Sequence, residues 1–342
     1  MTTDRYHRQM LVPQIGTQGQ NKLGKSCALI VGCGALGSTI AEQLARAGLG
    51  TIRIVDRDIV ELTNLQRQVM FDESDVSEGV PKAIAAAKRM HAINSEITVD
   101  PRVLDVDGSN IEDLCAGVHV ILDGTDNVAT RYLINDVSVK LGIPWVYGAC
   151  IGTEGRVMTI LPEGPCLRCV FRDPPNPREL PTCDTAGVLG SVASFVGSMQ
   201  SLSGIKLLSG NASAIPPELL SFELWTNRIH STNLKGAKRP DCPACGQRKF
   251  EFLQRRDRDM TARLCGRNIV QVRAIESGKI SLPAAAKRLE AAGRVSSSPF
   301  LVRCSLREGG LSLTAFEDGR VLVQGTTDPA KARSVVAKYF GA

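Results

Sequence analysis

The sequence predicts an α/β protein: a Rossmann-like, mostly parallel sheet with helices on both faces, stapled by zinc and followed by a small α+β domain. Strand and helix patterns alternate from residue 25 to about residue 155, the order expected of βαβ units. A G-x-G-x-x-G turn at residues 32–37 joins the first strand to a helix. Closely spaced strand patterns replace this alternation near residue 257. We therefore expect two domains, residues 1–256 and 257–342.

The elements of the first domain follow one another in regular order. Residues 27–31 and 52–55 are apolar runs that end at glycine or aspartate, as buried parallel strands do. The glycine turn opens a helix over 38–47. Further strands are expected at 97–99, 118–122 and 145–147, and further helices at 81–92 and 131–141.

The second domain is expected to have the order β-α-β-β-β-α. Strand patterns cover residues 268–272, 300–305, 311–316 and 320–324, with a hairpin turn at 317–319. A helical pattern covers 282–292, and Asp328 is placed as the N-cap of a last helix.

Composition limits the function classes. The formal charge of +6 suits an anion such as ATP and is too weak and scattered to indicate nucleic acid. Residues 1–9 lack the apolar core of a secretion signal. Residues 186–208 are interrupted by polar residues and glycine, which favours a buried or subunit-interface helix over a membrane span. We expect a cytoplasmic enzyme that contacts neither membrane nor nucleic acid.

The glycine turn predicts a nucleotide site. Gly32, Gly34 and Gly37 would let the backbone approach phosphate at a helix N-terminus, and Asp56, at the end of the next strand, would bind ribose hydroxyls. The alternatives are a chance glycine turn and an NAD site.

Basic and amide side chains near this turn favour a triphosphate over a dinucleotide. Arg67 can fork across phosphate oxygens, and Lys82 adds a point charge. Asn64 lies three residues before Arg67, so the two can share one face of a helical turn. The alternative is a solvated loop arginine and a surface lysine on a helix.

Asp126 follows the strand pattern at 118–122, with Asp123 nearby. A carboxylate at the mouth of a phosphate site could hold Mg²⁺, which prefers oxygen ligands. An N-cap for the following helix is the structural alternative, and the two roles are compatible.

Two C-x-x-C pairs, Cys166 with Cys169 and Cys242 with Cys245, provide four thiolates for a closed tetrahedral Zn²⁺ site. Their separation is longer than that of a zinc ribbon, so the ion would join distant segments. A redox C-x-x-C is the rival interpretation. The odd total of eleven cysteines argues against a disulfide scaffold.

Cys183 stands apart in a proline-rich stretch, residues 172–184, which we interpret as an exposed loop. An exposed thiol is a candidate nucleophile, and the alternative is a spare cysteine. The remaining six cysteines are expected to be packing residues: Cys27, Cys33, Cys115, Cys150, Cys265 and Cys304.

Together these features resemble the ThiF/MoeB family of sulfur-carrier adenylyltransferases, which are related to ubiquitin-activating enzymes. The resemblance spans about residues 4–250. It rests on both C-x-x-C pairs and on seven short motifs: 5–9 (RYHRQ), 32–37 (GCGALG), 56–58 (DRD), 64–68 (NLQRQ), 81–82 (PK), 125–127 (TDN) and 182–188 (TCDTAGV).

The resemblance implies ATP-dependent adenylation of the C-terminal Gly-Gly carboxylate of a small ubiquitin-fold carrier protein, ThiS-like or MoaD-like. It further implies a homodimer in which Arg8 reaches the partner subunit's ATP site, a sulfur-donor protein as a second partner, and Cys183 in thioester or persulfide chemistry. The motif around Cys183 favours the thiamin branch over the molybdopterin branch. An NAD-dependent oxidoreductase and a non-catalytic carrier-binding scaffold are the rival functions. The region from 259 onward lies outside the resemblance.

Overall fold

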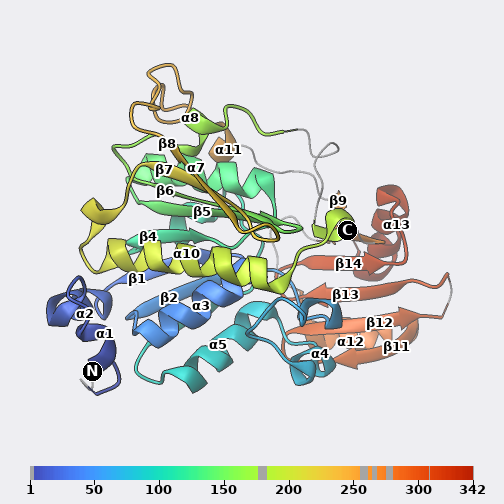
Figure 1. The fold of residues 1–342 in the computed structure, drawn as a ribbon. Helices are drawn as coiled ribbons and strands as arrows, with labels where there is room; N and C mark the ends of the chain where they lie inside the picture. The colour runs from blue at the N-terminus through green and yellow to red at the C-terminus, as the bar shows by residue number, and fades with distance from the viewer. Residues whose placement is uncertain are drawn as a thin grey trace. The chain divides into compact units, whose positions relative to one another are not determined.

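The computed structural model contains two compact units, Met1–Arg256 and Asp257–Ala342 (Figure 1). The larger unit carries the glycine turn and both cysteine pairs, and the smaller unit has its own sheet and core. The described residues are 4–175, 183–254, 261–263, 268–274, 280–307 and 309–341.

An eight-stranded sheet forms the centre of the larger unit, in the order β3-β2-β1-β4-β5-β6-β7-β8. The pairs from β3 to β5 are parallel, and those from β5 to β8 are antiparallel. This confirms the Rossmann-like, mostly parallel α/β fold. The strands are β1 (Cys27–Val31), β2 (Thr51–Val55), β3 (Thr98–Arg102), β4 (Val120–Asp123), β5 (Trp145–Ile151), β6 (Glu154–Ile160), β7 (Glu218–Glu223) and β8 (Arg228–Asn233).

Helices cover both faces of this sheet because its parallel strands are apolar on both sides. Successive residues of β1 point to opposite faces of the sheet. Ile30 packs in one core with the helices at 35–47, 82–93 and 190–208, and Leu29 packs in the other with the helices at 111–114 and 128–141. The longer helices are α3 (Ala35–Ala47), α5 (Lys82–Ile93), α7 (Val128–Leu141) and α10 (Gly190–Leu208) (Figure 1). Shorter helical segments are α1 (His7–Met10), α2 (Gly16–Leu23), η1 (Leu62–Asn64), α4 (Glu73–Glu78), α6 (Ile111–Leu114), α8 (Leu167–Val170), α9 (Cys183–Ala186), η2 (Ala212–Ala214) and α11 (Glu251–Gln254).

The order β3-β2-β1-β4 places a topological switch point between β1 and β4. The connections from these two neighbouring strands run in opposite directions along the sheet, which leaves a crevice beyond their carboxyl ends. The glycine turn follows β1, and the segment 123–127 follows β4, so the fold brings both to this crevice.

Cys183 lies in a different local structure from the one expected. The exposed-loop interpretation of residues 172–184 is wrong at its end, because Cys183 begins the helical turn α9. Residues 176–182 lie outside the described part of the chain.

The smaller unit is a six-stranded sheet in the order β11-β12-β13-β14-β10-β9, antiparallel throughout. Both its helices pack on one face, where Leu289 and Val336 join Val270, Val302 and Leu313 in a single core. The elements are β9 (Thr261–Arg263), β10 (Ile269–Arg273), α12 (Leu282–Leu289), β11 (Gly293–Ser297), β12 (Leu301–Leu306), β13 (Ser312–Phe316), β14 (Arg320–Gln324) and α13 (Pro329–Phe340).

The expected order β-α-β-β-β-α omits two strands, β9 and β11. The Gly-Arg-Val-Ser-Ser sequence of β11 has one large apolar side chain, so its sequence carries little alternation. Asp328 caps α13 as expected, since its carboxylate accepts a hydrogen bond of 2.8 Å from the Ala330 N–H.

The apolar stretch at residues 186–208 becomes α10, which packs on α3 and on β5. None of the helices in the described part of the chain combines the length and the apolar character that crossing a bilayer requires.

Candidate functional site

The backbones of three segments meet at the switch point without side chains between them. A Cβ on Gly37 would lie 1.9 Å from the Gly32 carbonyl oxygen, and one on Gly124 would lie 2.3 Å from the same atom. Gly32 itself has a φ of +89°, in the left-handed region that favours glycine. Gly32 and Gly37 are therefore required by packing alone, whatever the turn binds.

Gly34 differs from its two neighbours in the motif. A Cβ there would have its nearest contact at 3.7 Å, so the protein itself leaves room for a side chain. Gly34 is also the N-cap of α3 and supplies no side-chain cap to the first N–H groups of this helix. Uncapped N–H groups at the positive end of a helix could bind a phosphate.

Asp56 holds the glycine turn in place. Its carboxylate accepts hydrogen bonds from the Cys33 N–H at 2.6 Å and from the Asp58 N–H at 2.7 Å. Burial raises the pKa of Asp56, while the nearby Lys82 and these two N–H donors act against that rise. The structure thus gives Asp56 a supporting role inside the turn, and its ribose contact stays a prediction.

Lys82 is a buried cation, which rules out the surface-lysine alternative. Only 4% of the residue is exposed, and its Nζ lies 3.3 Å from Asp58 Oδ2. Burial lowers the pKa of Lys82, but the carboxylates of Asp58 and Asp56 outweigh burial and raise it overall. The ammonium group is therefore charged at neutral pH, beside the glycine turn.

Asn64 carries a buried donor without an acceptor in the described part of the chain. The residue is 1% exposed, its Oδ1 accepts from the Glu61 N–H at 3.1 Å, and its Nδ2 has no hydrogen-bond partner among the residues that the structure describes. The hydrogen bond from Glu61 fixes which end of the amide is the oxygen, so Nδ2 must face the other way. A ligand oxygen could accept a hydrogen bond from Nδ2. An unmatched donor and a buried ammonium suit an anionic ligand such as a triphosphate.

Arg67 follows on the same turn and is half-buried. Its Nη1 donates to the Thr63 carbonyl at 2.9 Å, which leaves other donors of the guanidinium for a ligand. The backbone beside it is closely packed: a Cβ on Gly190, the first residue of α10, would lie 2.7 Å from the Gln66 carbonyl oxygen and 3.3 Å from Arg67 Cα.

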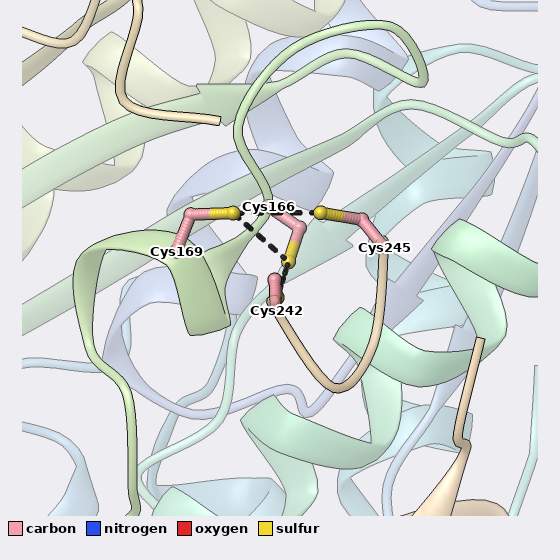
Figure 2. Close-up of side chains that lie close together, drawn as sticks. All are labelled: Cys166, Cys169, Cys242 and Cys245. Atoms are coloured by element: carbon pink, nitrogen blue, oxygen red, sulfur yellow. Dashed lines mark hydrogen bonds between the residues drawn. The ribbon is translucent and has the colours of Figure 1, made fainter. Parts of the chain in front are cut away.

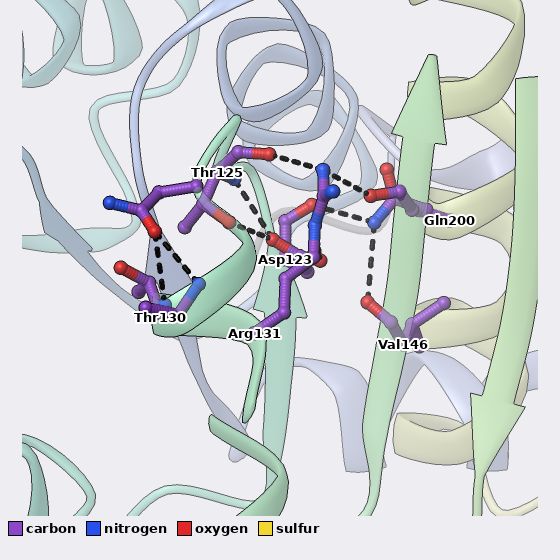
Figure 3. A network of polar contacts seen from close by, with 9 residues as sticks. Asp123, Thr125, Thr130, Arg131, Val146 and Gln200 are labelled. Atoms are coloured by element: carbon purple, nitrogen blue, oxygen red, sulfur yellow. Dashed lines mark hydrogen bonds and ion pairs between the residues drawn. The ribbon is translucent and has the colours of Figure 1, made fainter. Parts of the chain in front are cut away.

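The segment after β4 contains two aspartates with different environments, and Figure 3 shows the contacts of the first, Asp123. Asp123 is fully buried, accepts from the Thr125 N–H at 2.9 Å and pairs with Arg131 Nε at 3.1 Å. Burial raises the pKa of Asp123, and Arg131 and Thr125 oppose the rise. The protein itself thus satisfies the Asp123 carboxylate, whereas Asp126, three residues after the end of β4, is exposed.

The N-cap alternative for Asp126 is wrong, because Asn127 caps α7. The Asn127 Oδ1 accepts from the Ala129 N–H at 2.8 Å and from the Thr130 N–H at 3.4 Å. An exposed carboxylate such as Asp126 could hold Mg²⁺, which commonly binds one or two carboxylates together with substrate phosphates and water.

Gly37 and Gly124 pack on the Gly32 carbonyl, which joins the Asp126 segment to the glycine turn. Asp56 bonds to this turn through the Cys33 N–H, and Lys82 is connected to Asp56 through Asp58. Arg8 is exposed on α1, whose neighbour is α2, and its role in a partner subunit stays a prediction. Sequence reasoning did not assign Asp58 or Arg131. The signal for Asp58 was its position two residues after Asp56, next to Arg57.

The four paired cysteines form one cluster (Figure 2). Cys166 and Cys242 lie 3.5 Å apart at Sγ, Cys169 and Cys245 lie 3.4 Å apart, and the four sulfur atoms all fall within 4.8 Å of one another. Zn–S bonds of about 2.3 Å in a tetrahedron require sulfur separations of about 3.8 Å, which these distances approach. A hydrogen bond from Cys166 lowers the pKa of the Cys169 thiol, which favours the thiolate.

The cluster joins segments that are far apart in sequence. Cys166 precedes α8, and Cys242 and Cys245 lie in a turn where a Cβ on Gly246 would be 2.1 Å from the Pro240 carbonyl oxygen. Because all four thiols converge on one point, the donor set fits a structural zinc ion better than two separate redox pairs. The other described cysteines of the larger unit, Cys27, Cys33, Cys115 and Cys150, are buried or half-buried, as expected of packing residues.

Comparisons with known proteins agree with this architecture. The model of the ThiF family matches residues 6–244. The sulfur carrier protein ThiS adenylyltransferase of Bacillus subtilis is 42% identical over 341 residues, covering 99% of this chain and all of that protein. The sulfur carrier protein adenylyltransferase of Thermus thermophilus is 37% identical over 249 residues, 71% of this chain and 90% of that protein.

Among solved structures, E. coli MccB bound to MccA-N7isoASN superposes with a TM-score of 0.62 over 72% of this chain and 75% of MccB, at 21% sequence identity. This likeness concerns the fold. The family match and the two adenylyltransferases extend across the glycine turn, the segment after β4 and the first cysteine pair, so the chain belongs to the ThiF family.

Proposed function

We propose that this protein is an ATP-dependent adenylyltransferase that acts on the C-terminal carboxylate of a small sulfur-carrier protein ending in Gly-Gly. Membership of the ThiF family and the activities named for its relatives support this proposal. Two observations carry it: the buried cation Lys82, whose partner Asp58 is bonded to Asp56 under the glycine turn, and the buried Asn64 donor that has no partner among the described residues. A triphosphate supplies the negative charge that these groups require.

In the proposed reaction a carboxylate oxygen of the carrier attacks the α-phosphorus of ATP. A bond forms between this oxygen and phosphorus, and the bond from the α-phosphorus to the bridging oxygen breaks. Pyrophosphate leaves with the electron pair, and an acyl-adenylate remains. A terminal carboxyl group with a pKa of about 3.5 is already ionised, so the reaction needs no general base. Positioning and charge neutralisation therefore account for catalysis.

Each site residue receives one role in this proposal. Gly32, Gly34 and Gly37 shape the turn that receives the nucleotide, and Asp56 orders this turn and binds ribose. Lys82 neutralises phosphate charge. Asn64 and Arg67 donate to phosphate oxygens, Asp126 holds Mg²⁺, and Arg8 completes the site of the partner subunit in a homodimer.

We further propose that the carrier is ThiS-like and serves thiamin biosynthesis. The full-length match to a ThiS adenylyltransferase, including residues 257–342, supports this choice. A MoaD-like carrier of the molybdopterin pathway is the alternative. Sulfur would come from a donor protein, and thiol chemistry of this kind suits the reducing cytoplasm.

Pyrophosphate exchange into ATP tests the proposal. Exchange should require Mg²⁺ and a Gly-Gly carrier, and it should be faster with a ThiS-like than with a MoaD-like carrier. A carrier truncated by its last two residues is the matched control. Lack of exchange with every Gly-Gly carrier, or NAD binding with indifference to ATP, would contradict the adenylyltransferase assignment and favour the oxidoreductase.

Arg67→Ala separates catalysis from a scaffold role. We expect exchange to fall about 100-fold, because a donor aimed at developing phosphate charge is removed. Arg46→Ala, which removes an exposed arginine paired with Glu42 on α3, should leave exchange unchanged. Unchanged exchange in Arg67→Ala would contradict the phosphate role of Arg67. If a variant without any exchange still supported the pathway, the non-catalytic scaffold would be favoured.

Cys183→Ala should separate adenylation from the later sulfur chemistry. The thiol has no part in the attack on ATP, so we expect carrier-dependent exchange within about twofold of wild type. Sulfur transfer to the carrier should be lost, which mass spectrometry of the carrier C-terminus measures. Cys27→Ser is the control for general loss of a thiol. Loss of exchange in Cys183→Ala would contradict the assigned role.

A further inference from the structure

Gln200 is a fully buried polar side chain on α10, a helix whose other buried residues are apolar or small (Figure 3). Its Nε2 donates to the Asp123 carbonyl at 2.8 Å and to the Val146 carbonyl at 3.2 Å. Both partners are carbonyl oxygens, so only the amide nitrogen can face them. One side chain of α10 therefore binds the carboxyl end of β4 and a residue of β5.

The Asp123 carbonyl needs a donor because the ladder between the two strands stops before it. The last paired residues of β4 and β5 are Leu122 and Val146, and the chain leaves the sheet after Asp123. An unpaired buried carbonyl is costly, and Gln200 supplies a donor to the Asp123 carbonyl while it also bonds to the Val146 carbonyl on the neighbouring strand. The fit is close, since a Cβ on Gly148 would lie 2.2 Å from Gln200 Cδ.

A second contact fixes the same segment from the opposite side. Arg131 Nη2 donates to the Thr125 carbonyl at 2.7 Å and to the Gly148 carbonyl at 3.2 Å, while its Nε holds the Asp123 carboxylate. The segment that carries Asp126 is thus held at its base by Gln200 and along its length by Arg131.

The first residue of α10, Gly190, lies against the turn that carries Arg67, because it closely approaches the Gln66 carbonyl. One rigid helix therefore contacts the backbone of both sides of the site: the Arg67 turn through its first residue, and the Asp126 segment through Gln200. The distance between phosphate-binding and metal-binding groups then depends on where α10 lies.

We propose that Gln200 is a positioning residue that sets the Asp126 segment relative to the Arg67 turn. The inference rests on the proposed adenylation and on the Mg²⁺ role of Asp126 within it. Gln200 does not touch substrate; it acts through the main chain of Asp123. Its loss should weaken the use of Mg²⁺ more than it slows the reaction at saturating Mg²⁺.

Gln200→Met in the full-length protein tests this proposal, because methionine keeps the volume and removes both hydrogen bonds. We expect the Mg²⁺ concentration for half-maximal pyrophosphate exchange to rise about tenfold, with kcat at saturating Mg²⁺ within about threefold of wild type. Ser201→Ala is the matched control, since the neighbouring buried hydroxyl donates only to Gly197 within α10. It should leave the Mg²⁺ dependence unchanged.

A lower Tm in Gln200→Met with an unchanged Mg²⁺ dependence would overturn the proposal. If Gln200→Met does not fold, Gln200→Asn is the milder variant. The asparagine side chain is one methylene shorter, so its amide cannot reach both carbonyls. It should raise the Mg²⁺ concentration for half-maximal exchange in the same way. Hydrogen exchange of the amides at residues 124–127 gives a second readout that needs no activity. These amides should exchange faster in both variants but not in Ser201→Ala, and this decides the proposal even if no carrier supports exchange.

Discussion

Replacing Lys82 by methionine is expected to reduce carrier-dependent pyrophosphate exchange by about 100-fold to 1000-fold. Lys82 is buried, carries a full positive charge because of Asp58 and Asp56, and lies beside the glycine turn. Its ammonium group acts in a site of low dielectric, where charge neutralisation is worth more than at a surface. Methionine keeps an unbranched side chain of similar length and removes the charge together with the hydrogen bond to Asp58.

The same substitution removes the buried cation of Asp58 and Asp56 and leaves them Arg57, whose Nε lies 3.8 Å from Asp58 Oδ1. We therefore expect a lower affinity for ATP, measured by calorimetry, as well as slower exchange. Lys88→Met is the matched control because Lys88 is exposed on the same helix, α5, and should leave both quantities unchanged. An exchange rate within threefold of wild type in folded Lys82→Met would contradict the phosphate role.

Replacing Cys242 by serine is expected to release zinc and to unfold part of the larger unit. Cys242 is fully buried, and its sulfur lies 3.5 Å from that of Cys166, so a serine oxygen would leave an incomplete donor set inside the core. Zinc bound to such a site contributes about 10 kcal/mol or more to the stability of small metal-dependent domains. A large decrease of Tm is the expected result.

Elemental analysis and calorimetry measure this effect. Wild-type protein should contain one zinc ion per chain, and Cys242→Ser should contain less than a tenth of that amount. Cys27→Ser removes a half-buried thiol outside the cluster and should retain both the zinc and the Tm. Zinc-free wild-type protein with an unchanged Tm in Cys242→Ser would show that the cluster is not a metal site.

The parallel half of the sheet could be predicted because strands buried on both faces have apolar sequences without interruption. Cys27–Val31 and Val120–Asp123 show this directly. The antiparallel strands could not be placed in the same way. β8 forms the edge of the sheet and is exposed along its whole length, so nothing in Arg-Ile-His-Ser-Thr-Asn requires a strand.

The candidate residues could be predicted by type and spacing but not by environment. The spacing of Asn64 and Arg67 indicated a shared turn, whereas the burial of Asn64 and its unmatched Nδ2 depend on how the turn packs. The sequence could not reveal Gln200 either, because its acceptors lie 77 and 54 residues away along the chain. Contacts of this kind arise only when the strands and α10 have come together.

The backbone contact among Gly32, Gly37 and Gly124 limits how this site can diverge. Three chain segments already fill the space, so even an alanine at Gly37 would place a Cβ 1.9 Å from a carbonyl oxygen. The segments that follow β1 and β4 cannot move apart, because these two strands are paired side by side. A change of nucleotide preference would have to come from the surrounding side chains. Selection experiments on this scaffold should therefore recover new specificities at Asn64 or Arg67, and none at these three glycines.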